Sequence, residues 1–139
     1  MSTDQFTTKY NGQFIDVDGK YGAQCVDLMR KYLVDVLGLN AYVIPPTDYA
    51  KNIFNNFPNK GTDKFTKVFN SANNYPRKGD IVFWGFYPFI TGFAGHVAIC
   101  TWADSMHLVA FSQNYPTGSA SVLRNFNYKG VMGWLSPKI

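Results

Sequence analysis

Apolar residues recur every three or four positions between residues 25 and 37, at Cys25, Leu28, Met29, Tyr32, Leu33, Val36 and Leu37. This spacing is typical of one face of an amphipathic helix, and Gly38 is expected to end it. The segment PPTDYAKNIFNNF, residues 45–57, predicts a loop followed by a second, short helix capped by Thr47 or Asp48. We therefore expect helices in the first part of the chain.

The pattern changes after residue 79, where β-branched and aromatic residues form short runs separated by Gly, Asp, Ser and Pro. Such runs predict strands, and we expect them at residues 80–86, 95–103, 106–114, 121–127 and 130–137. Helices followed by antiparallel strands indicate an α+β domain. We see no linker, repeat or low-complexity segment, so the expectation is a single domain over residues 1–139.

Composition narrows the possible classes of protein. The chain has 139 residues, 46% of them hydrophobic and 16% charged, a balance typical of one globular domain. The net charge of +4 mildly favours an acidic polymer, wall or membrane surface as partner, and the absence of a basic run gives no reason to expect nucleic acid. No signal peptide and no membrane span is predicted. Two Cys and two His are too few for a disulfide framework or a structural zinc site.

Cys25 stands at the predicted start of the first helix, where free N–H groups and the helix dipole favour a thiolate and can stabilise an oxyanion. A nucleophilic cysteine also needs a proton acceptor. His96 follows Gly95 and opens a predicted strand, whereas His107 follows a predicted turn and is expected to be exposed. The alternative for Cys25 is a small buried residue, and Cys100, in the middle of a strand, fits that description.

A third residue should orient the imidazole ring. Asn114 is the preferred candidate because its amide oxygen can accept the ring N–H, and Ser112, on the same strand face, is the weaker candidate. The alternative for Asn114 is a turn residue before Tyr115. Gln24 precedes the cysteine and is a candidate oxyanion donor, with a structural role as the alternative.

Asp16, Asp18, Lys20, Gly22 and Asp27 fall at positions 1, 3, 5, 7 and 12 of an EF-hand-like loop. The match is imperfect, because Lys20 offers only its carbonyl and Tyr21 occupies the position where an EF-hand has Gly. From the residues alone, the loop is either a Ca²⁺ site or a solvated acidic turn. Several aromatic residues are candidates for a substrate groove or for packing: Trp84, Phe86, Tyr87, Phe89 and Tyr115.

The motifs GKYGAQCVDL, KGDIVFW, GHVAI, SQNYP and GWLSP, in this order, resemble the CHAP domain, a cysteine, histidine-dependent amidohydrolase/peptidase. The likeness is greatest to CHAP domains of bacteriophage endolysins that attack Gram-positive cell walls. It implies a papain-like α+β fold with N-terminal helices packed on an antiparallel sheet, Cys25 as nucleophile and His96 as base. It also implies Asn114 in the catalytic set and Ca²⁺ at Asp16, Asp18, Lys20, Gly22 and Asp27. The family often has an acid where this chain has Ser112.

The resemblance implies a peptidoglycan hydrolase that cuts an amide bond, as an N-acetylmuramoyl-L-alanine amidase or as an endopeptidase. The alternatives are a non-catalytic wall-binding or virion structural module, supported by the missing acid, and a cysteine peptidase that acts on proteins. We expect a protein held in the host cytoplasm until release, or carried in the virion, with a wall-binding domain attached or separate.

Overall fold

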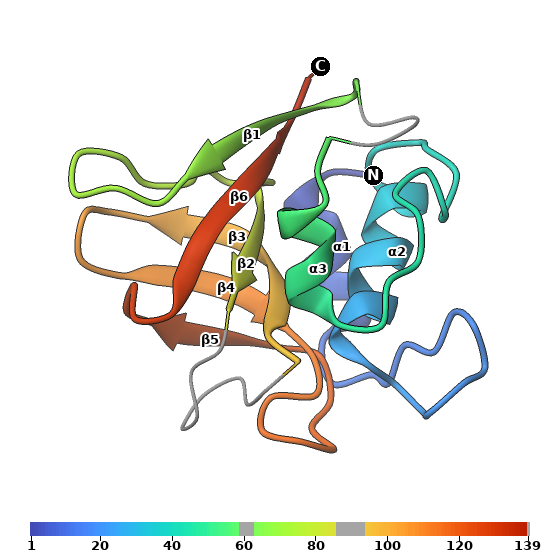
Figure 1. Ribbon diagram of the computed structural model, residues 1–139. Helices are drawn as coiled ribbons and strands as arrows, with labels where there is room; N and C mark the ends of the chain where they lie inside the picture. Colours follow the sequence, from blue (N-terminus) through green and yellow to red (C-terminus); the bar gives the residue numbers. More distant parts are fainter. Residues whose placement is uncertain (59–62, 86–93, 139) are drawn as a thin grey trace.

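A computed structural model describes residues 1–58, 63–85 and 94–138 of the chain. Three helices come first and six strands follow (Figure 1). The elements are α1 (Thr3–Tyr10), α2 (Cys25–Asp35), α3 (Ala50–Asn55), β1 (Phe65–Phe69), β2 (Ile81–Trp84), β3 (His96–Ala103), β4 (Leu108–Ser112), β5 (Val122–Phe126) and β6 (Val131–Pro137). The α+β class is confirmed.

The strands form one antiparallel sheet in the order β1-β6-β2-β3-β4-β5. The three helices pack together beside the sheet, and α2 contacts β3 (Figure 1). β2 and β3 are therefore central strands, and the start of β3 lies close to the helical layer. This arrangement brings the first turn of α2 toward the first residues of β3.

Side chains alternate between two buried clusters, one on each face of the sheet. Ile81 and Phe83 of β2 join the helix residues in the first cluster, which contains Phe6, Leu28, Tyr32, Leu33 and Phe54. Val82 and Trp84 belong to the second cluster with strand residues such as Ala98, Cys100, Ala110, Phe126 and Trp134. Both faces of β2 are buried, which explains its continuous apolar run.

The sequence pattern did not lead us to expect two of these elements, α1 and β1. α1 begins with a capping box in which Ser2 and Gln5 exchange side-chain and backbone hydrogen bonds, so its signal was present in the letters STDQ. Phe6 and Tyr10, four residues apart, are its buried residues. β1, the second missed element, begins at Phe65 and forms an edge strand against β6.

Arg30 lies on the face of α2 that the apolar pattern leaves polar, yet it is 4% exposed. The loop after α2 crosses this face, and Arg30 Nη1 donates hydrogen bonds to the carbonyls of Ala41 (2.7 Å) and Ile44 (3.0 Å). Its guanidinium also stacks on the Tyr42 ring, 4.6 Å from the centroid. Arg30 thus fixes the loop that forms one wall of the site described below.

Within the three described ranges, no helix combines the length and the hydropathy needed to cross a membrane.

Candidate active site

Cys25 is the first residue of α2, as the sequence predicts. The residue is half-buried, and nearby backbone N–H groups, foremost those of Val97 and Val26, act as hydrogen-bond donors that favour a thiolate. Burial nevertheless dominates and raises the pKa of the thiol to about 11, with the hydrogen bonds opposing it and the negative charge of Asp27 adding to it. The expected thiolate is therefore not the resting state, because desolvation outweighs the favourable helix end.

His96 is the first residue of β3 and is 3% exposed. Aromatic rings surround its imidazole, with centroids at 5.4 Å for Trp84, 5.8 Å for Tyr115 and 6.4 Å for Phe126. Burial in this setting, with a smaller contribution from the positive charge of Arg124, lowers the pKa of His96 to about 3. The imidazole is therefore neutral at physiological pH, as is the thiol of Cys25 in the same cleft.

Gly95 explains how His96 is placed. Its φ of +77° lies in the left-handed region, and a Cβ there would come within 2.5 Å of the Trp84 carbonyl oxygen and 2.8 Å of Lys51 Cβ. The chain can therefore pass between β2 and α3 only with glycine at this position. This steric restriction explains why a glycine precedes His96 in the sequence.

Ser112, not Asn114, contacts the imidazole ring. Ser112 Oγ lies 2.7 Å from His96 Nε2, and both residues are buried. β4 ends at Ser112, and Asn114 has a φ of +62° in the turn that follows. The Asn114 side-chain oxygen accepts a hydrogen bond from the Gly118 N–H at 2.7 Å. Asn114 lines the same cleft but does not contact the ring, because β4 ends at Ser112, two residues before it; its place in the catalytic set stays a prediction.

The two other candidate residues for the same chemistry lie elsewhere. Cys100 is fully buried in the second cluster, in the middle of β3. His107 is exposed in the β3–β4 turn, where its backbone N–H donates to Asp104. Neither lines the cleft that holds Cys25 and His96.

Two glutamines flank the site, and the sequence singled out only one of them. Gln24 Nε2 donates to the Tyr21 carbonyl at 2.8 Å, so its role as an oxyanion donor stays a prediction. Gln113 is fully buried and hydrogen-bonds to Ile15, Gln24 and Ser121. Nothing in the local pattern distinguished Gln113 from a solvated strand-end residue, because its partners are up to 98 positions away.

Cys25 and His96 open onto a single cleft of about 920 Å³. It is bounded by the acidic loop, the first turn of α2, the segment before α3, the start of β3 and the turn after β4. Tyrosines 21, 42, 49 and 115 contribute to its walls, and Tyr21 is 92% exposed.

Of the aromatic residues predicted to line a groove, the structure places one in the cleft and buries another. Tyr115 lines the cleft. Trp84 does not, because it is fully buried between His96 and Phe126, so its assignment to the groove was wrong. Phe86, Tyr87 and Phe89 lie outside the described residues. Tyr21, Tyr42 and Tyr49 were missed, since they come from loops whose meeting depends on the fold.

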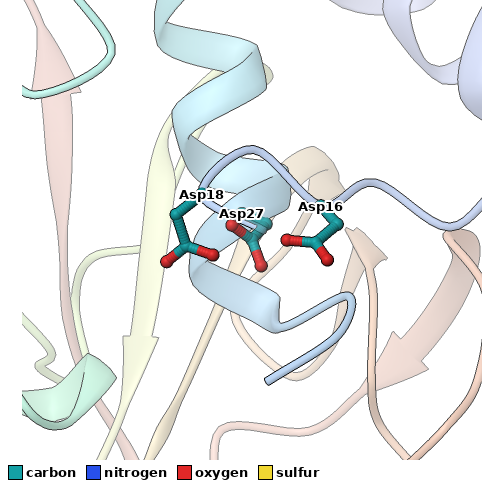
Figure 2. A group of neighbouring side chains, drawn as sticks. All are labelled: Asp16, Asp18 and Asp27. Carbon is teal, nitrogen blue, oxygen red and sulfur yellow. The ribbon is translucent and has the colours of Figure 1, made fainter. Parts of the chain in front are cut away.

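Three aspartates meet beside the cleft (Figure 2). Asp16 and Asp18 come from the loop and Asp27 from the first turn of α2, and one carboxylate oxygen of each lies within 4.8 Å of the others. Asp27 accepts the backbone N–H groups of Val17 (3.1 Å) and Gln24 (2.9 Å), which joins the loop to the helix. Burial, with the negative charge of Asp18 adding to it, raises the pKa of Asp27.

The loop backbone also has left-handed residues in its middle. Tyr21 has a φ of +61°, and Gly19 and Gly22 have φ values of +70° and +72°. Tyr21 therefore adopts, without being glycine, the type of backbone that an EF-hand needs at its sixth position. The backbone ligands expected at Lys20 and Gly22 stay a prediction.

The sequence of this chain is similar to that of one curated phage protein. It is 29% identical over 136 residues to endolysin PlyTW of Staphylococcus phage Twort, strain DSM 17442 / HER 48. The match covers 88% of this chain and 26% of PlyTW, so the chain spans about a quarter of that relative.

Two solved proteins share the fold, and the first of them is an endolysin. The crystal structure of wild-type endolysin LysIME-EF1 superposes with a TM-score of 0.73 at 22% identity, covering 99% of this chain and 64% of that one. Ly7917 gives a TM-score of 0.65 at 17% identity, covering 99% and 62%, and it has also been solved with "the hydrolyzing product of MDP". These neighbours establish the papain-like CHAP fold expected from the sequence.

The family model described as the CHAP domain matches residues 15–114, a span that begins before the acidic loop and ends after the residues around His96. It therefore covers Cys25, His96 and Ser112 as well as most of the described core. This chain belongs to the CHAP domain family.

Proposed function

We propose that this CHAP domain is a peptidoglycan hydrolase that cuts an amide bond in the peptide part of the wall by cysteine catalysis. The observation that carries the proposal is the meeting of Cys25 and His96 in one open cleft, with Ser112 on the far nitrogen of the ring. Endolysins are the relatives in sequence and in fold, which supports the wall as substrate.

The hydrogen bond to Ser112 decides which ring nitrogen acts as base. If His96 Nε2 carries the proton and donates it to Ser112 Oγ, Nδ1 is unprotonated and can accept the proton of the Cys25 thiol. A hydroxyl can accept in the same way after the ring becomes an imidazolium. A serine at this position can accept the Nε2 proton in the tautomer that the reaction uses, although it lacks the charge with which a carboxylate would stabilise the cation.

The reaction then follows from two neutral partners. Cys25 Sγ forms a bond to the amide carbon while its proton moves to His96 Nδ1, and the carbonyl electron pair moves to the oxygen. Free N–H groups at the start of α2 stabilise this oxyanion. The C–N bond breaks as His96 returns the proton to the leaving amine, which leaves a thioester. Water, deprotonated by His96, attacks the thioester and releases a carboxylic acid and the thiol.

We also propose that Asp16, Asp18 and Asp27 hold Ca²⁺. The donor set fits, because three hard carboxylate oxygens converge there within 4.8 Å of one another. The ion would supply positive charge that holds the loop against α2. Its contribution is the placement of Cys25, two residues before Asp27, and no step of the reaction passes through it.

The non-catalytic alternative rested on the missing acid at position 112. The Ser112 hydroxyl contacts the ring at that position, so the imidazole has a polar partner and the alternative has no specific support. Gram-positive walls are the proposed target, since PlyTW belongs to a Staphylococcus phage. Storage in the host cytoplasm until release, or in the virion, is proposed with it.

Zymography on Gram-positive walls beside a casein gel tests the function, with Cys25→Ala as the matched inactive control. We expect clearing of the wall gel by the wild type alone and no clearing of casein. Mass spectrometry of the released fragments separates new amino groups on L-alanine, produced by an amidase, from those on stem or cross-bridge residues, produced by an endopeptidase. Clearing by Cys25→Ala at the wild-type rate would refute cysteine catalysis.

A further inference from the structure

Gln113 follows β4 directly and is fully buried. Both polar atoms of its carboxamide are hydrogen-bonded. Oε1 accepts from the Ile15 N–H (2.7 Å) and from Ser121 Oγ (2.9 Å), and Nε2 donates to the carbonyls of Ile15 (2.8 Å) and Gln24 (2.7 Å). Two donated and two accepted bonds satisfy the amide and leave it one orientation, because Ile15 N–H needs an oxygen and the carbonyls need N–H groups. Gln113 is therefore a fixed crosslink and not an adjustable side chain.

The Gln24 carbonyl is the significant partner, because it belongs to the same peptide unit as the Cys25 N–H. A trans peptide is planar, so fixing the direction of its C=O also fixes the opposite direction of its N–H. A hydrogen bond to the carbonyl oxygen also polarises the amide and makes its N–H a better donor. The Cys25 N–H lies in the first turn of α2, where a backbone N–H has no partner within the helix.

We propose that Gln113 is a positioning residue that sets the Cys25 N–H as the oxyanion donor, acting through the Gln24–Cys25 peptide. This inference deepens the proposed function and rests on it for its biological substrate. When Cys25 Sγ bonds to a carbonyl carbon and its proton passes to His96 Nδ1, the electron pair of the C=O bond collects on oxygen. The N–H that Gln113 orients meets this charge as it forms.

Two small reagents separate this role from general support of the fold. Iodoacetamide alkylates Cys25 by forming a C–S bond as iodide leaves from a saturated carbon, so no oxyanion arises. p-Nitrophenyl acetate acylates Cys25 through a tetrahedral oxyanion, which expels p-nitrophenolate. In both reactions the thiol proton goes to His96. Only acylation uses the oxyanion donor.

The variants are Gln113→Glu, which keeps the shape but turns an oxygen toward two carbonyls, and Gln113→Met, which is neutral and still testable if a buried carboxylate prevents folding. Gln13→Glu is the matched control, since Gln13 is an exposed glutamine two residues before Ile15. We expect alkylation within about threefold of wild type and acylation lowered about 10- to 100-fold in either Gln113 variant. The control should change neither rate.

Thermal melts establish that each variant is folded before rates are compared. An equal fall in both rates would overturn the proposal, because it would show that Gln113 supports the thiol or the histidine and not the oxyanion. Two unchanged rates would overturn it as well. Neither reagent contains wall material, so a wild type that acylates but fails to clear walls would refute the proposed function and leave this inference intact.

Discussion

The buried, neutral state of His96 has a measurable consequence for stability. In the unfolded chain a histidine accepts a proton below pH 6.5, whereas in the fold burial lowers the pKa of His96 to about 3. Between these values the unfolded state binds the proton and the folded state does not, so the free energy of unfolding falls as the pH falls. Above pH 6.5 the ring is neutral in both states, and titration of His96 costs the fold no stability.

The size of the effect follows from the two pKa values. With 1.36 kcal/mol for each pKa unit, lowering the pH from 8 to 5 should cost the fold about 2 kcal/mol through His96 alone. Other groups titrate in this range too, so the quantity to compare is the loss between the two pH values in matched variants. His96→Asn removes the titration, and His107→Asn, at an exposed turn, is the control.

Urea unfolding followed by tryptophan fluorescence at pH 8 and pH 5 provides the assay. We expect the wild type and His107→Asn to lose about 2 kcal/mol more than His96→Asn on acidification. An equal loss in wild type and His96→Asn would refute a buried neutral ring. A wild type that becomes relatively more stable at pH 5 would indicate an imidazolium paired with a thiolate.

Three further predictions concern the nucleophile, the orienting residue and the metal. Iodoacetamide should label Cys25 and spare the buried Cys100 in peptide mapping of the native protein, and Cys100→Ala should clear walls normally; labelling of Cys100 first would contradict the assignment. Ser112→Ala should lower kcat about 10- to 100-fold in a wall-turbidity assay, and Asn114→Ala much less, because only the serine contacts the ring; the reverse order would return the role to the asparagine. EGTA should lower the melting temperature, since Ca²⁺ at a hundredfold excess over Kd contributes about 2.7 kcal/mol to the stability of the fold. Asp18→Asn should abolish this response. An unchanged melting temperature in protein shown to be metal-free would mean that the loop is only an acidic turn.

Several features of this protein were determined locally and could be predicted from the sequence. The period of apolar residues predicted α2 with Cys25 at its start, and alternating runs predicted the five strands from β2 to β6. His96 could be chosen over His107 because one follows a glycine into a strand and the other follows a turn. The predictions of α2 and of the strands are confirmed, because helix starts, turns and strand alternation depend on neighbours in the sequence.

α1 and β1 show the limit of reading local signals. The capping box of α1 was visible, but only two of its eight residues are buried, so its apolar stripe is thin. β1 has five residues and pairs with β6, whose partner residues lie more than 60 positions later. Short elements of this kind are stabilised mainly by what they pack against.

The tertiary structure alone decided how the site works. Ser112 rather than Asn114 meets the ring because β4 ends at Ser112, and Gln113 is buried because distant segments close around it. The protonation states of Cys25 and His96 were set by desolvation, which outweighs the helix end and follows from the whole packing around them. A sequence specifies which groups are available, but burial and the directions of hydrogen bonds are sums over residues far apart in the chain, and they exist only once it has folded.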